Sequence, residues 1–307
     1  MKACIFLDID GTLLDHEIGI QESSRIAIAQ AQANGHRVCL ATGRPKPEVD
    51  DEIQAIPFDG CIYSCGAMVE SHGKVLFYKP FSQELVLHMM HLLQAHAIGF
   101  NLEGSRTSFL DPIGYDFFHS LFQRCMEDNS ELARQYMAAV RMHPLQEVKE
   151  TDTLQIMKIA TFINEDSLLQ EFDRQLPAQL KHIHHGFHEG CTNGEIYHHT
   201  ITKATGIDCL LSHFDIPLEA SIAIGDSLND AEMIRHCNLG VAMGNACEEL
   251  KLISDMITTT SKEDGIYNCM KKLKTHIIII LSNSLKLFLY FLRLYYRNRF
   301  SYSSITV

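Results

Sequence analysis

Residues 4–15 read Cys-Ile-Phe-Leu-Asp-Ile-Asp-Gly-Thr-Leu-Leu-Asp. The apolar run of residues 4–7 predicts a buried strand, and two carboxylates, Asp8 and Asp10, follow its end together. Burying ionised carboxylates is costly unless a cation or hydrogen-bond donors compensate, so acids placed here indicate a metal, a reaction or both. An Asp before Gly can also be a plain turn. Further stretches downstream, however, complete a site in a consistent order, which favours the catalytic interpretation.

The composition is that of a globular protein with one large domain or two ordinary ones. Of the 307 residues, 46% are hydrophobic and 21% are charged. The net charge of -12 argues against nucleic acid or an anionic membrane as the main partner of the folded part. Ten cysteines are scattered without CxxC spacing, as core cysteines in a reducing compartment are. No signal peptide is recognisable before the first strand, so we expect a cytoplasmic enzyme, monomeric or homodimeric.

A second strand is predicted over residues 37–41, after a helix over residues 22–34 that would make a parallel crossover. This strand ends in Thr42-Gly43-Arg44. The Thr hydroxyl, accessible backbone N–H groups and the guanidinium of the Arg can all donate hydrogen bonds to phosphate oxygens. The alternative is an ordinary strand-to-helix turn with Thr42 as its cap.

A third such segment lies far downstream, where the apolar strand of residues 221–224 runs into Gly-Asp-Ser-Leu-Asn-Asp at residues 225–230. In an open parallel sheet, the carboxyl ends of the strands lie along one edge, and ligands bind there. We therefore expect Asp8 and Asp10 to meet Thr42 and the acids of residues 226–230. Carboxylates and an amide beside one Lys and one Arg match Mg²⁺ that keeps some of its waters and binds a substrate phosphate.

The middle of the chain has a different pattern. Residues 69–78 predict a hairpin, and from there short strands alternate with helices, including helices over residues 82–96, 129–140 and 165–176. The predicted fold class is α/β, with a Rossmann-like parallel-sheet core and an inserted α/β cap. The expected limits are 1–80 and 190–272 for the core, 81–189 for the cap, and 273–307 for an apolar and basic tail.

These motifs resemble the haloacid dehalogenase-like hydrolase superfamily, specifically the Cof-type phosphatases. The resemblance covers about residues 1–270 and rests on Asp-x-Asp-Gly-Thr-Leu, Ala-Thr-Gly-Arg, a lone downstream Lys and Gly-Asp-Ser-x-Asn-Asp. The second Asp of the first motif is typical of the phosphatases, because the P-type ATPases of the superfamily have Lys there. An insertion that falls between Thr42 and Lys203 is similar to the large C2-type α/β cap.

The resemblance implies roles for individual residues. Asp8 would be the nucleophile that forms an aspartyl-phosphate, and Asp10 would protonate the leaving group and then activate water. Phosphate or substrate contacts are expected from Thr42, Gly43, Arg44, Lys203 and Asn229, and Mg²⁺ ligands from Asp8, Asp10 (through its main-chain carbonyl), Asp226 and Asp230. An ion pair at the domain hinge is the alternative for Arg44, and orientation of the metal ligands is the alternative for Asn229 and Asp230.

Two positions leave the assignment open. Lys181 competes with Lys203 as the phosphate-binding lysine, and the position of Lys203 after Glu195-Ile196 favours Lys203. Cys65-Gly66-Ala67 stands where the family usually has Asn-Gly-Ala. A thiol cannot supply the paired hydrogen bonds of an amide, so a contact near the site or the hinge is expected to change.

The predicted function is a Mg²⁺-dependent phosphatase for small phosphorylated metabolites, either sugar phosphates or phosphorylated cofactors. The alternatives are a phosphosugar mutase of the same superfamily and a non-catalytic metabolite-binding or regulatory protein. A mutase needs a cap that reorients a bisphosphate, and the cap sequence contains no dense Arg cluster.

Two segments lie outside this interpretation. The histidine-rich residues 182–188 and 198–199 could hold zinc, although alternating histidines in a strand more often form a solvated face. If one of them acts, we expect it to contact substrate from the cap. The apolar tail is interrupted by Asn283, Lys286 and Arg293. It is compatible with a membrane-associated helix, which would be the one membrane contact of the protein. The alternatives are an extra packed helix, a segment that binds a partner, and an appended tail.

Overall fold

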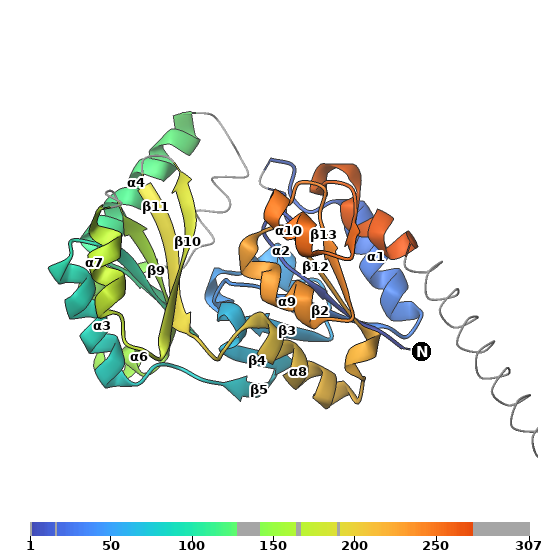
Figure 1. The fold of residues 1–307 in the computed structure, drawn as a ribbon, viewed down its shortest axis with the longest axis horizontal. Helices are drawn as coiled ribbons and strands as arrows, with labels where there is room; N and C mark the ends of the chain where they lie inside the picture. The colour runs from blue at the N-terminus through green and yellow to red at the C-terminus, as the bar shows by residue number, and fades with distance from the viewer. Residues whose placement is uncertain (1, 16, 128–141, 164–166, 189–190, 273–307) are drawn as a thin grey trace, which may run out of the picture.

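A computed structural model describes residues 2–15, 17–127, 142–163, 167–188 and 191–272, which form two lobes joined side by side (Figure 1). One lobe is built on an eight-stranded sheet and the other on a six-stranded sheet. The predicted helix over residues 129–140 and the tail over residues 273–307 lie outside the described residues.

The larger sheet is parallel except at one edge. Its strands, in spatial order, are β14 (Met256–Ile257), β13 (Leu239–Ala242), β12 (Ser221–Gly225), β1 (Cys4–Leu7), β2 (Arg37–Ala41), β3 (Gly60–Tyr63), β4 (Met68–Ser71) and β5 (Lys74–Tyr78). The last two strands are antiparallel and form the hairpin predicted from the sequence. β1 pairs in parallel with both β2 and β12, so the strand order reverses beside β1. A ligand site is expected at the carboxyl end of this strand.

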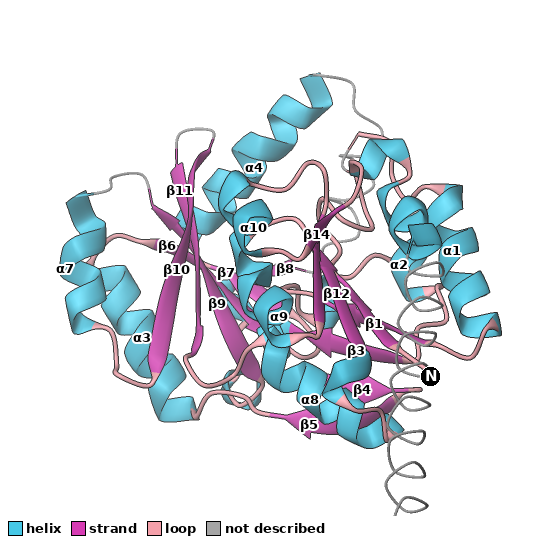
Figure 2. Cartoon of the chain, turned by 45° about the vertical axis from the view of Figure 1, so that its right-hand side comes forward, coloured by secondary structure: helices cyan, strands magenta, loops and turns pink. Residues whose placement is uncertain are grey.

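Helices bury both faces of the larger sheet (Figure 2). Successive β1 side chains point to opposite faces: Ile5 and Leu7 pack in one apolar cluster, Cys4 and Phe6 in the other. The first cluster includes residues of α1 (Glu22–Ala33) and α2 (Asp51–Gln54). The second includes residues of α8 (Lys203–Phe214), α9 (Ala231–His236) and α10 (Glu248–Ile253). This arrangement confirms the predicted α/β class.

The smaller sheet is mostly antiparallel. Its strands, in order, are β10 (Leu180–His188), β11 (Cys191–His198), β9 (Ile156–Ile163), β6 (Gly99–Gly104), β7 (Ser108–Leu110) and β8 (Met142–Pro144). The accompanying helices are α3 (Gln83–Ala95), α4 (Pro112–Glu127), α6 (Glu150–Thr153) and α7 (Ser167–Gln175). Figure 1 shows α3 and α7 on the outer side of this sheet, while its other side turns toward the larger lobe. Short 3-10 turns occur at Lys46–Glu48, Ser64–Gly66, Leu145–Glu147, Leu218–Ala220, Leu228–Asp230 and Ser261–Glu263.

One predicted boundary differs from the structure. The second core segment was expected to begin at residue 190, but β11 (Cys191–His198) lies between β9 and β10 and is antiparallel to both. Its eight residues therefore complete the smaller sheet before the chain returns to the larger one at α8. The sequence could not predict that residues 191–198 belong to the smaller sheet, because the pattern of a single strand does not indicate which strands it pairs with.

Within the described ranges, no helix is both long enough and apolar enough to cross a membrane. The expected cytoplasmic location stays a prediction.

Candidate active site

The carboxyl ends of β1 and β12 bring the first carboxylates together. Asp8 continues the β1 pairing, because its N–H donates to Ile224 O at 3.1 Å, and only 4% of the residue is exposed. The loop after it passes close to Asp226. Gly11 has φ +75°, and a Cβ there would lie 2.2 Å from Asp226 Oδ2. Only glycine permits both this backbone conformation and this approach.

Lys203, the first residue of α8, bonds two of the carboxylates. Its Nζ donates to Asp8 Oδ1 at 2.6 Å and to Asp230 Oδ1 at 2.6 Å. The other oxygen of Asp230 accepts from the backbone N–H of Asp226 at 3.0 Å and of Ser227 at 3.2 Å. Lys203 is 2% exposed and Asp230 is fully buried. The lysine and the turn after β12 therefore fix the two carboxylates in one orientation.

The electrostatics of this cluster favour a cation. Burial, followed by the nearby carboxylate of Asp230, raises the pKa of Asp8 well above its usual range, although Lys203 acts in the opposite direction. Burial and the same carboxylate raise the pKa of Asp226 to about 7. Asp8, Asp226 and Asp230 each offer an oxygen, and these oxygens all lie within 4.8 Å of one another. Three carboxylates with one ammonium leave an excess of negative charge, which suits a hard cation such as Mg²⁺.

Asp10 lies at the mouth of the site, and Arg44 holds it. Arg44 Nε donates to Asp10 Oδ2 at 2.8 Å, and a second guanidinium nitrogen bonds the other carboxylate oxygen. The same guanidinium donates to Glu48 O and to Asp50 Oδ2, both at 3.2 Å. The Asp10 side chain keeps 41% of its surface exposed. The structure thus shows Arg44 positioning Asp10, and its contact with phosphate stays a prediction.

Thr42, Gly43 and Asn229 come together at the same edge of the sheet. Thr42 is buried, and its Oγ1 accepts from the backbone N–H of Arg44 at 3.0 Å. A Cβ at Gly43 would lie 3.8 Å from Asn229 Nδ2, so the segments after β2 and β12 are neighbours. Ser227 Oγ donates to Asn229 Oδ1 at 2.7 Å and orients that amide.

The structure separates the two candidate lysines. Lys181 Nζ lies 3.1 Å from Glu232 Oε1 in a half-exposed ion pair, whereas Lys203 lies between the buried carboxylates. Lys203 is thus the lysine beside Asp8, and its contact with phosphate stays a prediction.

Cys65 has a left-handed backbone conformation and contacts both lobes. It has φ +54°, a left-handed conformation in which Asn is enriched and which is uncommon for other residues. Its N–H donates to Thr42 O at 3.2 Å, and its thiol lies 3.8 Å from Glu195 Oε2. The residue therefore still connects the Thr42 segment with the smaller lobe, through a weak S–H donor.

Sequence reasoning missed a buried polar network between the lobes. Lys158, on β9, donates to Gly43 O at 2.7 Å, lies 3.0 Å from Glu103 Oε2, and forms an ion pair with Glu195. Two further side chains of the smaller sheet, Asn101 and Ser108, donate to Glu48 Oε1. The one sequence signal was a lone lysine inside the apolar strand Ile-Met-Lys-Ile-Ala.

Comparisons with known proteins point to one family. A family model described as haloacid dehalogenase-like hydrolase matches residues 5–270. Phosphatase YwpJ of Bacillus subtilis is 25% identical over 290 residues, covering 88% of this chain and 99% of that protein. The 5-amino-6-(5-phospho-D-ribitylamino)uracil phosphatase YitU of the same organism is 25% identical over 280 residues, covering 87% and 96%.

Solved structures show the same fold over nearly their whole length. A haloacid dehalogenase-like hydrolase from B. subtilis superposes with a TM-score of 0.74 at 25% identity, covering 88% of this chain and 99% of that one. A sugar phosphatase of subclass IIB superposes with a TM-score of 0.71 at 26% identity, covering 89% and 99%.

Proposed function

The chain belongs to the haloacid dehalogenase-like hydrolases, and from this premise we propose that it is a Mg²⁺-dependent phosphatase of small phosphorylated metabolites. One observation carries the proposal: the buried Asp8, at the end of β1, is bonded to the buried Lys203, and Asp226 and Asp230 each have an oxygen close enough to share one metal ion with Asp8. Relatives that match nearly the whole chain are named phosphatases.

The reaction follows from the placement of these groups. A carboxylate oxygen of Asp8 attacks phosphorus as the bond from phosphorus to the leaving oxygen breaks, and Asp10 gives that oxygen a proton. Asp10 then takes a proton from water, whose oxygen attacks phosphorus and releases Asp8. Lys203, the Thr42 hydroxyl and the N–H groups after it hold the phosphoryl oxygens. Mg²⁺, held by Asp8, Asp226 and Asp230 with the main-chain carbonyl of Asp10, would supply charge neutralisation.

We also propose that the smaller lobe, residues 81–198, is the cap that selects the leaving group, with the core formed by residues 1–80 and 199–272. Its sheet alternates apolar and polar side chains. Phe100 and Leu102 pack in the outer apolar cluster, while Asn101 and Glu103 contact the inter-lobe network. This polar inner face suits a hydroxyl-rich or otherwise polar leaving group.

The first prediction concerns the metal. Phosphate release from a panel of sugar phosphates and phosphorylated cofactors should require Mg²⁺ and fall at least about a hundred-fold in EDTA, because the metal contributes several kcal/mol to stabilising the transition state. Colorimetric detection of inorganic phosphate measures this. Mg²⁺ added in excess over EDTA should restore the rate. Equal rates with Mg²⁺ and EDTA would contradict the proposed metal dependence.

The second prediction concerns Lys158. Lys158→Met leaves the buried Glu103 without this ion pair, and it removes the ion pair with Glu195 and the bond to Gly43 O. Breaking a buried ion pair on one side costs about 3–5 kcal/mol. We expect a lower unfolding free energy in urea and a kcat/KM reduced about ten-fold or more, because the Thr42-Gly43 segment loses its support from the cap.

Lys74→Met is the matched control, since Lys74 is exposed at the start of β5. It should change neither quantity. Adding Glu103→Gln to Lys158→Met should recover part of the stability by removing one unpaired charge. A Lys158→Met variant as stable and as active as the parent would mean that the network has no role in joining the lobes.

A further inference from the structure

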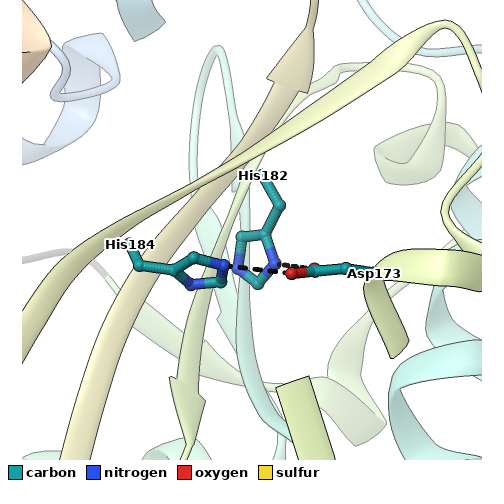
Figure 3. A group of neighbouring side chains, drawn as sticks. All are labelled: Asp173, His182 and His184. Carbon is teal, nitrogen blue, oxygen red and sulfur yellow. Dashed lines mark hydrogen bonds and ion pairs between the residues drawn. The ribbon is translucent and has the colours of Figure 1, made fainter. Parts of the chain in front are cut away.

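A second group of side chains that could hold a metal ion lies on the outer side of the smaller sheet. Asp173 comes from α7, and His182 and His184 come from β10; Figure 3 shows the three side chains pointing toward one another. His182 Nδ1 lies 2.8 Å from Asp173 Oδ1, and His184 Nε2 lies 3.2 Å from Asp173 Oδ2. The ligand atoms of all three residues lie within 4.8 Å of one another.

The two histidines share a face because strand side chains alternate. Lys181, which precedes His182 in β10, reaches Glu232 of the larger lobe, so the side chains of His182 and His184 point to the opposite side of the sheet. His182 and His184 therefore face α7, and the expectation that they contact substrate does not fit this direction. The group is separate from the acidic cluster of the active site.

His182 is anchored as metal-bound histidines usually are. Its side chain is 2% exposed, and its ring packs edge-on against Phe172 with centroids 5.5 Å apart. Its second nitrogen, Nε2, lies 2.9 Å from Thr161 Oγ1. When Nδ1 binds a metal, Nε2 carries the proton, and a hydroxyl can accept it. Asp173 and His184 are 38% and 32% exposed, which leaves a side open for an ion to enter.

The spacing of the donors suits a tetrahedral ion. Bonds of about 2.0–2.2 Å to zinc place neighbouring ligands about 3.3 Å apart. His182 Nδ1 lies 2.8 Å from Asp173 Oδ1 and His184 Nε2 lies 3.2 Å from Asp173 Oδ2, so each nitrogen is already close to this distance from a carboxylate oxygen. Two imidazoles and one carboxylate favour Zn²⁺ or a similar transition metal over Mg²⁺, which prefers oxygen ligands.

We propose that Asp173, His182 and His184 bind a divalent transition-metal ion, with Zn²⁺ the best match, and that this ion ties α7 to the edge strand β10. The ion replaces two imidazole protons that would otherwise bond the Asp173 carboxylate. It joins a helix of nine residues to the outermost strand of the sheet. Its role is structural, and it does not depend on the proposed phosphatase reaction.

The test is zinc binding by the full-length, metal-free protein, measured by competition with a chromophoric chelator in excess Mg²⁺, which keeps the acidic cluster occupied. The parent protein should bind one more equivalent of Zn²⁺ than His184→Ala or Asp173→Asn. His88→Ala, an exposed histidine of α3 in the same lobe, is the matched control and should keep the full stoichiometry.

A second readout is thermal unfolding. Zn²⁺ should raise the unfolding midpoint of the parent and of His88→Ala, because a ligand that binds only the folded state stabilises it. The increase should be smaller in His184→Ala and Asp173→Asn. Circular dichroism without metal should show all four proteins folded. Equal stoichiometry and equal thermal shifts in the parent and in His184→Ala would overturn the proposal, whatever the phosphatase assays give.

Discussion

Replacing Asp8 with asparagine should abolish Mg²⁺-dependent phosphate release, with a loss in kcat of at least about a thousand-fold. The change keeps the size and shape of the side chain, and its amide oxygen can still accept the bond from Lys203 Nζ. An amide, however, is too weak a nucleophile to form the covalent bond to phosphorus. Initial-rate assays on the best substrate of the panel measure the effect.

Stability should separate this loss of chemistry from a loss of structure. Burial and the neighbouring carboxylate of Asp230 raise the pKa of Asp8, so its charge is unfavourable in the folded protein without metal. Asp8→Asn removes that charge, and we therefore expect an unfolding midpoint in EDTA no lower than that of the parent. Asp116→Asn, at an exposed position of α4, is the control and should keep full activity.

The outcome also distinguishes the alternatives. Phosphate release that survives Asp8→Asn would remove Asp8 as the nucleophile. If the parent itself releases no phosphate from any member of the panel, a mutase assay with a bisphosphate primer becomes the deciding experiment, because a mutase and a non-catalytic binding protein would both give that result.

The main features of the larger lobe were predictable for a physical reason. Carboxyl ends of parallel strands lie along one edge, so the acids at Asp8 and Asp226 were expected at the same edge once both apolar runs were strands of one sheet, and the pairing of β1 with β12 makes them neighbours. The sequence also favoured Lys203 over Lys181, from its place after the Glu195-Ile196 segment, although its contact with phosphate stays a prediction. In the structure, Lys203 at the start of α8 bonds the carboxylates of Asp8 and Asp230.

The inter-lobe contacts were beyond the sequence. Alternation in a strand shows which side chains share a face, but not which face meets another lobe. Lys158 and Glu103 pair across β9 and β6, 55 positions apart, through a register that only the folded sheet defines. For Arg44 the sequence left a phosphate contact and an ion pair at the domain hinge open, and it could not name Asp10 as the partner of an ion pair.

The group on the outer face needed the structure as well. His182 and His184 sit in a histidine-rich strand, which the sequence leaves open to zinc or to solvent. Their partner Asp173 lies on the predicted helix of residues 165–176, but nothing in the sequence placed that helix beside the histidines. The packing of α7 against the sheet brings these three ligands together, and no fixed spacing in the sequence predicts that packing.

Lys203→Met should have the second large effect, on both catalysis and stability. Burial alone lowers the pKa of a lysine, but the carboxylates of Asp230 and Asp8 raise that of Lys203 above its ordinary value. The ammonium is therefore charged throughout the working pH range, and its loss leaves two buried carboxylates facing each other. We expect the unfolding free energy in EDTA to fall by about 3–5 kcal/mol. Losing a charged donor to the phosphoryl oxygens should lower kcat by about 10²–10³-fold.

Lys181→Met is the matched control, because it removes the competing lysine from a half-exposed ion pair worth about 0–1 kcal/mol. It should leave kcat nearly unchanged. Mg²⁺ should narrow the stability difference between Lys203→Met and the parent, since the cation neutralises the same carboxylates, but it should not restore kcat, because no group replaces Nζ beside Asp8. Loss of activity in Lys181→Met with full activity in Lys203→Met would make Lys181 the phosphate-binding lysine. The phosphate would then lie where β10 of the smaller lobe faces α9 of the larger lobe.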